Sequence, residues 1–126
     1  MATVLLVRRD TLNSVHALKI LDITSEDVAR RLLQEGQVQA TLQHPNIVPI
    51  HERGQLVDGR HYFTMREVKG KELISHIQAF HFKKKGAFGL HQLLSILQKV
   101  CMAVAYAHSQ GVLHRDLKPQ NILIGE

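Results

Sequence analysis

Hydrophobic and polar positions at the start of the chain follow a strand pattern. Two short runs rich in β-branched and leucine side chains, Thr3 to Val7 and Val15 to Leu21, flank a polar stretch at residues 9–14. Runs of this length on either side of a polar turn are typical of paired strands. The pattern predicts a β-hairpin.

A helical pattern follows the hairpin. Thr24 or Ser25 stands where a helix N-cap is expected, and the acidic pair Glu26 and Asp27 falls in the first turn, where the helix dipole favours negative charge. Apolar positions at helical spacing continue to about Leu42. We expect a helix over this segment.

The remaining elements are predicted in the order strands, then helices. Residues 47–51 and 62–68 read as two strands, and residues 72–80 as a short helix. Apolar residues recur at i, i+3, i+4 and i+7 from Leu90 to Ser109, and small alanines make much of the other face apolar. Such a helix is expected to be buried inside a larger body. A loop then leads to a short strand at residues 121–124.

Composition narrows the class of protein. Of 126 residues, 44% are hydrophobic and 21% charged, which suits a globular chain rather than a disordered one. No uninterrupted apolar run approaches the eighteen or so residues that cross a bilayer, and the apolar N-terminal heptapeptide lacks the basic region of a signal peptide. We therefore expect a cytoplasmic location. Cys101 is expected to be a buried, inert thiol, and the spacing of the nine histidines indicates no metal site.

The charge balance leaves a nucleic-acid alternative open. The net charge is +5 and the sequence pI is about 9.7. The basic residues are scattered except for Lys83-Lys84-Lys85, which precedes Gly86 and reads as a solvated loop. A small basic nucleic-acid-binding protein would instead show a clustered positive face and strongly salt-dependent affinity.

Residues 114–121, His-Arg-Asp-Leu-Lys-Pro-Gln-Asn, carry the strongest chemical signal. They match in full the catalytic-loop pattern of protein kinases, H-R-D-L-x-x-x-N. Phosphoryl transfer needs a carboxylate that accepts the hydroxyl proton, a cation near the γ-phosphate and an oxygen ligand for Mg²⁺. Asp116, Lys118 and Asn121 supply these three groups.

The chain resembles bacterial-type serine/threonine protein kinases over essentially its whole length. Residues 15–21, Val-His-Ala-Leu-Lys-Ile-Leu, look like the family's V-A-I-K strand with one substitution and an inserted histidine. The resemblance implies that Lys19 holds the α- and β-phosphates of ATP. It also implies that Glu35, ten residues before Pro45, pairs with Lys19.

The same resemblance implies an adenine pocket. Met65 would be the gatekeeper at its back, and the backbone of Arg66 and Val68 would bond the adenine edge. Glu72 falls where many members place an acidic residue near the ribose. The side chains that would sandwich the base are Val4, Ala17 and Leu123.

The implied function is an ATP-dependent serine/threonine protein kinase, with ATP and Mg²⁺ as co-substrate and cofactor and a protein hydroxyl as acceptor. In this family a lysine at the position of Lys118 accompanies serine or threonine acceptors. Arg115 is similar to the arginine of kinases that are switched by a phosphorylated activation loop. No nucleic acid and no membrane segment are expected as partners.

The sequence departs from the family at both ends. Residues 1–4 look like the tail of the glycine-rich loop, with Ala2 at the last glycine position, and the D-F-G segment is missing. We therefore expect a partial α+β, protein-kinase-like domain over residues 1–126. It would comprise a small antiparallel-sheet lobe with one helix (about 1–68) and the start of the helical large lobe (about 69–126).

Such a fragment is expected to be poorly stable and inactive alone. A pseudokinase-like binding or interaction module is the first alternative, and a small-molecule kinase a weaker one. If the kinase interpretation holds, Lys19 and Glu35 lie within ion-pair reach. Asp116 and Asn121 converge on the cleft floor and face Lys19.

Overall fold

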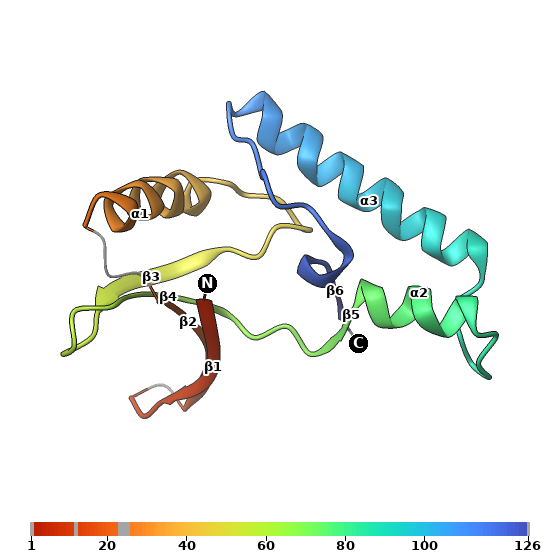
Figure 1. Cartoon of the computed structure of the whole chain (residues 1–126), viewed down its shortest axis with the longest axis horizontal. Coiled ribbons are helices and arrows are strands. Elements are labelled where there is room, and N and C mark those ends of the chain that lie inside the picture. Colours follow the sequence, from red (N-terminus) through yellow and green to blue (C-terminus); the bar gives the residue numbers. More distant parts are fainter. Residues whose placement is uncertain (1, 12, 23–25, 126) are drawn as a thin grey trace. The chain divides into compact units, whose positions relative to one another are not determined.

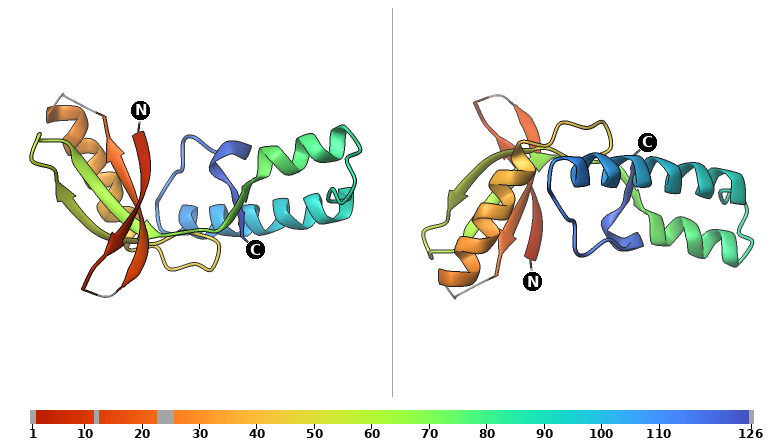
Figure 2. Two further views of the ribbon diagram at one scale, coloured as in Figure 1. Left: turned by 90° about the horizontal axis from the view of Figure 1, so that it is seen from below. Right: turned by 90° about the horizontal axis from the view of Figure 1, so that it is seen from above.

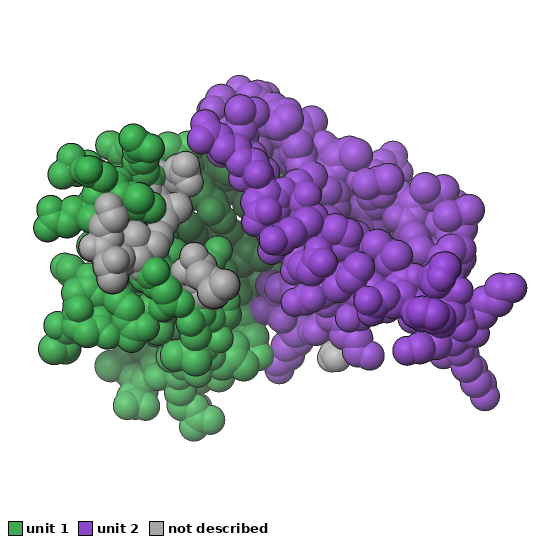
Figure 3. Space-filling model, in the orientation of Figure 1, with its two compact units in different colours: residues 1–67 green, residues 68–126 purple. Residues whose placement is uncertain are grey.

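The computed structural model describes residues 2–11, 13–22 and 26–125, and the side chains of residues 2, 32 and 35 lie outside the described set. The chain divides into two compact units, residues 1–67 and residues 68–126, which Figure 3 shows in different colours. The sequence-based division was drawn at about residue 68. Each unit is described by itself.

The first unit holds a four-stranded antiparallel sheet (Figure 1). Its strands are β1 (Ala2–Arg9), β2 (Ser14–Leu21), β3 (Ile50–Gln55) and β4 (His61–Arg66), in the order β1-β2-β4-β3. β1 and β2 form the expected hairpin, in register from Ala2 opposite Leu21 to Arg9 opposite Ser14. The small antiparallel sheet of the predicted fold class is thus confirmed.

One helix, α1 (Glu26–Ala40), lies along a face of this sheet (Figure 2). Gly36 is buried and allows close approach, because a Cβ there would lie 2.5 Å from the ring of Phe63 on β4. The core beneath the helix is made of small and medium apolar side chains: Ala17, Ile20, Leu21, Ala29, Leu42 and Phe63. The N-cap predicted at Thr24 or Ser25 lies outside the described residues.

Two strand boundaries differ from the prediction. β3 begins at Ile50 instead of residue 47, because the N–H of Ile47 donates to the His44 carbonyl in a turn and Pro49 has no N–H for a ladder. β3 then runs through Gly54 to Gln55, four residues past the predicted end at residue 51. β4 ends at Arg66, two residues earlier than expected.

The second unit is mainly helical. It contains β5 (Gly70–Glu72), α2 (Leu73–His81), α3 (Leu90–Ser109), the 3₁₀ turn η1 (Pro119–Asn121) and β6 (Leu123–Gly125). β5 and β6 pair as a short antiparallel ribbon, and the Leu73 N–H donates to the Ile122 carbonyl at 2.8 Å. The bounds of α3 agree with the sequence pattern. The strand β5 was not expected.

A glycine follows the end of α3. Gly111 has φ +77°, a conformation that only glycine adopts without strain. Its N–H donates to the His108 carbonyl, and the Val112 N–H donates to the Ala107 carbonyl, both at 2.9 Å. These two bonds form a Schellman motif, which satisfies carbonyls at the helix end.

Most of the α3 surface is open. Leu90, Leu94, Leu97 and Met102 are each more than half exposed, whereas Ala103 and Ala107 are buried. The burial expected for this helix is thus limited, among the described residues, to its alanine face. The prediction of a buried Cys101 was wrong: its side chain is exposed, because the faces of α3 other than the alanine face are open.

By length and composition, the 20-residue helix α3 could also cross a membrane, because an 18-residue window within it has a mean hydropathy of 1.2. Polar residues interrupt its apolar sequence, so the chain has no uninterrupted apolar run of that length here. A core helix of a globular domain meets the same criterion, and the polar His91, Gln98 and Lys99 within α3 favour that second interpretation.

Candidate active site

Three side chains of the 114–121 loop come together in the second unit. The Asn121 side-chain amide donates to the Asp116 backbone carbonyl at 2.8 Å and to its carboxylate at 3.2 Å. The Lys118 ammonium lies 3.5 Å from the same carboxylate. A carboxylate, a cation and an amide thus meet around one point.

The local backbone explains this convergence. The Asp116 N–H donates to Nδ1 of His114 at 3.1 Å, and Arg115 between them has φ +67°. Pro119 opens η1, where a proline is tolerated because no N–H is needed. The Asn121 N–H then bonds the Lys118 carbonyl at 2.9 Å. The loop is therefore closed at both ends by its own hydrogen bonds.

His114 is a positioning residue that the sequence analysis had not singled out. Its ring accepts the Asp116 N–H and so orients the backbone that carries the carboxylate. The signal was present as the first letter of the H-R-D motif. The roles expected from phosphoryl-transfer chemistry fell only on the third, fifth and eighth residues of the motif, which are Asp116, Lys118 and Asn121.

The donor set suits Mg²⁺, which is bound through oxygen ligands, commonly one or two carboxylates with substrate phosphates. Because the Asn121 Nδ2 is committed to Asp116, the Asn121 Oδ1 is the amide atom left to bind a cation. The Asp116 side chain is 69% exposed and so accessible to a ligand. Within residues 2–11, 13–22 and 26–125, no group of three or more His, Cys, Asp or Glu side chains is placed to hold a metal ion. A cation at Asp116 and Asn121 would therefore need further ligands, such as substrate phosphates.

Lys19 lies in the first unit, on the central part of the sheet. It stands on β2 opposite Val4 of β1 and Phe63 of β4, and its side chain is exposed. Glu35 belongs to α1, but its side chain lies outside the described set. The ion pair between Lys19 and Glu35 therefore stays a prediction.

The candidate adenine residues fall in both units. In the first, buried Ala17 stands opposite Met65 across the β2–β4 ladder, Val4 is 60% exposed, and Arg66 closes β4. In the second, half-buried Val68 precedes β5, and Glu72 stands opposite Leu123 in the β5–β6 ribbon. Their predicted roles, and the predicted approach of Asp116 to Lys19, stay predictions.

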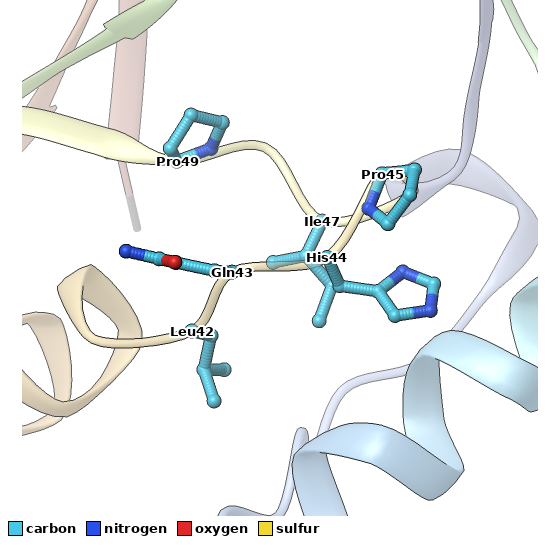
Figure 4. Close-up of a pocket in the computed structure, with 6 residues that line it drawn as sticks. All are labelled: Leu42, Gln43, His44, Pro45, Ile47 and Pro49. Carbon is cyan, nitrogen blue, oxygen red and sulfur yellow. The ribbon is translucent and has the colours of Figure 1, made fainter.

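A hollow of about 350 Å³ lies in the loop between α1 and β3 (Figure 4). The residues that line it are Leu42, Gln43, His44, Pro45, Ile47 and Pro49. None of them is among the predicted site residues, and none is a carboxylate or a cation. The hollow therefore shares no residue with the candidate active site.

In the first unit, an arginine shifts the pKa of a neighbouring carboxyl group. In the β3–β4 turn, hydrogen bonds from the Arg60 side chain and N–H lower the pKa of Asp58, and Asp58 in turn raises the pKa of Arg60. The Arg60 guanidinium lies 2.8 Å from Asp58 and 3.2 Å from Asp22. The three side chains brace the turn against the end of β2.

Comparison with known proteins agrees with this geometry. The family model for the protein kinase domain matches residues 1–126. The chain is 37% identical over 127 residues to the serine/threonine-protein kinase PknJ of Mycobacterium tuberculosis, and 35% identical over 127 residues to PrkC of Bacillus subtilis. Each match covers 98% of this chain, but only 20% of PknJ and 19% of PrkC.

A solved structure shows the same fold. The crystal structure of the Mycobacterium tuberculosis PknI kinase domain matches with a TM-score of 0.80 and 32% sequence identity. The match covers 99% of this chain and 49% of the PknI chain. The 126 residues thus span about a fifth of the two curated relatives and about half of a solved kinase domain.

Proposed function

Because the chain belongs to the protein kinase family, with bacterial serine/threonine kinases as relatives, we propose that the activity of its whole protein is phosphoryl transfer from Mg-ATP to a serine or threonine hydroxyl of a protein. The family uses ATP and a divalent metal in general. The observation that carries the proposal is the convergence of Lys118 and Asn121 on Asp116.

Each group of this cluster has a role in the proposed reaction. The Asp116 carboxylate accepts the proton of the attacking hydroxyl, which raises its nucleophilicity as the phosphorus–oxygen bond forms. The Lys118 ammonium offsets negative charge on the γ-phosphoryl oxygens. The Asn121 Oδ1 would hold Mg²⁺, which supplies charge neutralisation to the phosphates when bound.

The first unit supplies the nucleotide-binding part of the proposal. Lys19 would bind the α- and β-phosphates and Glu35 would orient it. Met65 and the backbone of Arg66 and Val68 would meet the adenine edge. Support comes from the β2–β4 ladder, which holds Ala17 and Met65 opposite each other two residues from Lys19. The remaining proposed contacts are Val4, Glu72 and Leu123.

Activity is proposed for a longer polypeptide than these 126 residues. About half of the solved PknI kinase domain lies outside the region that matches this chain. Most of the length of PknJ also lies outside the matching region. Transfer depends on positioning and electrostatic stabilisation by several elements together. We expect the 126 residues alone to remain near background. A cytoplasmic location of the domain is part of the proposal.

The test uses a chimera in which residues 1–126 replace the matching half of the PknI kinase domain. Transfer of labelled phosphate from ATP with Mg²⁺ is measured on matched peptides that differ only in a serine, threonine or tyrosine acceptor. We expect labelling of the serine and threonine peptides and little of the tyrosine peptide.

The 126-residue chain and the chimera without Mg²⁺ are the controls, and both are expected to stay at background. A folded chimera that binds ATP and labels none of the peptides would contradict the proposal. It would favour a pseudokinase-like binding module instead.

A further inference from the structure

The excess positive charge of the chain lies entirely in its second unit. Residues 1–67 contain eight lysines and arginines and eight acidic residues, whereas residues 68–126 contain eight basic and three acidic residues. The surplus of five equals the net charge of the whole chain. Residues 73–115 contain no aspartate or glutamate at all. A segment of this length without acidic residues favours an anionic partner.

A hollow of about 410 Å³ lies between α2 and the loop at residues 82–89, lined by this segment and by Lys71 just before it. It is distinct from the 114–121 loop. Polar and basic side chains line much of it, and the ones that matter here are Lys71, Ser75, His76, Lys84, Lys85 and Phe88. No carboxylate is among its lining residues.

Among the residues that the structure describes, the three lysines of the hollow have no carboxylate partner. No described carboxylate lies within ion-pair distance of Lys71, Lys84 or Lys85, although Lys118, Arg9 and Arg60 all have such partners. Three uncompensated ammonium groups around one hollow raise the local positive potential. That potential attracts a compact anion more strongly than separated surface lysines do.

The loop that carries two of these lysines is held in place. The His76 ring on α2 stacks on the Phe88 ring with centroids 4.2 Å apart and planes 2° from parallel. At the end of α2, the Lys84 N–H donates to the Ala79 carbonyl at 2.9 Å, and Lys83 turns the chain with φ +50°. A ligand that enters the hollow would therefore meet lysines on a fixed backbone, which lowers the entropic cost of binding.

We propose that the hollow formed by Lys71, Lys84 and Lys85 is a binding site for a phosphate monoester, presented by a phosphorylated serine or threonine of a protein segment. Such a group carries about −1.5 to −2 charges at neutral pH and three strong acceptor oxygens. Ammonium groups and the Ser75 hydroxyl are its chemical complement. The concave site matches one compact dianion better than a flat anionic membrane, whose binding needs basic side chains spread over a plane.

The test compares two peptides that are identical and neutral except that one carries a single phosphothreonine. Binding of each fluorescent peptide to the 126-residue chain is measured at an ionic strength of about 0.15 M, without ATP, so that the result is independent of phosphoryl transfer. We expect the phosphopeptide to bind at least about tenfold more tightly than its unmodified partner. Free phosphoserine should compete with it.

Two double variants separate the hollow from general charge. Lys84→Gln with Lys85→Gln removes two lining cations, and Lys83→Gln with Lys99→Gln removes two exposed cations that do not line the hollow. We expect about a tenfold loss of phosphopeptide affinity in the first and less than about a twofold loss in the second. Circular dichroism establishes that both variants keep the fold of the parent chain.

Four results would overturn the proposal. The two peptides would bind equally, or both double variants would lose affinity equally, which indicates non-specific charge attraction. In the third, vesicles with anionic lipid would bind through Lys84 and Lys85 while the phosphopeptide did not, which indicates a membrane surface. Competition by free phosphoserine as strong as the phosphopeptide itself would assign the site to small phosphate esters instead of a protein segment.

Discussion

The side-chain amide of Asn121 donates two hydrogen bonds to a single residue, Asp116, one to its backbone carbonyl at 2.8 Å and one to its carboxylate at 3.2 Å. The five-residue separation is bridged by η1, which turns the chain back on itself. The proposed metal ligand and the proposed proton acceptor are therefore positioned by each other. A change at either residue is expected to disturb both functions.

Replacement of Gly36 by alanine tests the packing of α1 on the sheet. The new Cβ would lie 2.5 Å from the ring of Phe63, which is buried at 6% exposure, so the ring would have to shift. Overpacking costs about 1 to 3 kcal/mol, and alanine recovers up to about 1 kcal/mol in helix propensity. We expect the free energy of unfolding, measured by urea titration, to fall by about 1 to 2 kcal/mol.

The double variant Gly36→Ala with Phe63→Leu is the control, because a smaller side chain makes room for the Cβ. The double variant should lose less unfolding free energy than the sum of the two single losses, as expected for residues in direct contact. Strict additivity of the two substitutions would show that Gly36 and Phe63 do not pack together.

Lys83 offers a substitution that stabilises the chain. Its φ of +50° is strained for a residue with a Cβ, and this strain costs about 1 to 2 kcal/mol. Glycine removes the strain, but its greater freedom in the unfolded chain costs about 0.5 to 1 kcal/mol. Lys83→Gly should raise the unfolding free energy by about 0.5 to 1 kcal/mol. Lys83→Ala removes the same charge but keeps the strain, so equal stability of the two variants would sink this explanation.

Local patterns predicted much of this fold. The β1–β2 hairpin and both ends of α3 follow from residues that are close in sequence, including the Gly111 cap. The H-R-D-L-x-x-x-N motif likewise placed Asp116, Lys118 and Asn121 in one loop, since eight consecutive residues can hardly diverge. In each case the deciding interactions are local.

Features set by distant residues were missed. β5 exists because Gly70 to Glu72 pair with β6, more than fifty positions away, and no local pattern marks three such residues as a strand. β3 begins late because of the turn before Pro49 and ends late because Gly54 pairs with Tyr62. The exposure of Cys101 depends on what covers α3, which the helical pattern alone does not specify.

Acid should weaken the β3–β4 turn through Asp58. Hydrogen bonds from Arg60 lower the pKa of this carboxyl in the folded chain, so its stabilising contribution is complete above the unfolded pKa. That contribution is lost as the pH falls through the lower, folded pKa. Titration of the Asp58 carboxyl carbon by NMR should show its pKa rising toward the ordinary value in Arg60→Gln. Arg8→Gln, an exposed arginine elsewhere, should leave it in place; an unchanged pKa in Arg60→Gln would contradict the assignment.

The open face of α3 predicts self-association of the 126-residue chain. Leu94 and Leu97 are 53% and 52% exposed and lie one turn apart. Leu94→Gln with Leu97→Gln should shift sedimentation toward monomer with little loss of stability, since these side chains are already half in water. Ala103→Gln, at a position 7% exposed, should destabilise the fold instead. A parent chain that sediments as a stable monomer and binds no hydrophobic dye would be evidence against this expectation.

The measurement that tests the central claim most directly is phosphoryl transfer by the PknI chimera with Asp116→Asn. Asparagine keeps the shape and can still accept the bond from Asn121, but it cannot take the proton of the attacking hydroxyl. We predict a fall in the transfer rate of about 10²- to 10⁴-fold with ATP affinity nearly unchanged. Asp58→Asn, which neutralises an exposed carboxyl in the β3–β4 turn, should leave the rate unaltered. An Asp116→Asn chimera that transfers phosphate as fast as its parent would contradict the assignment of this loop as the catalytic centre.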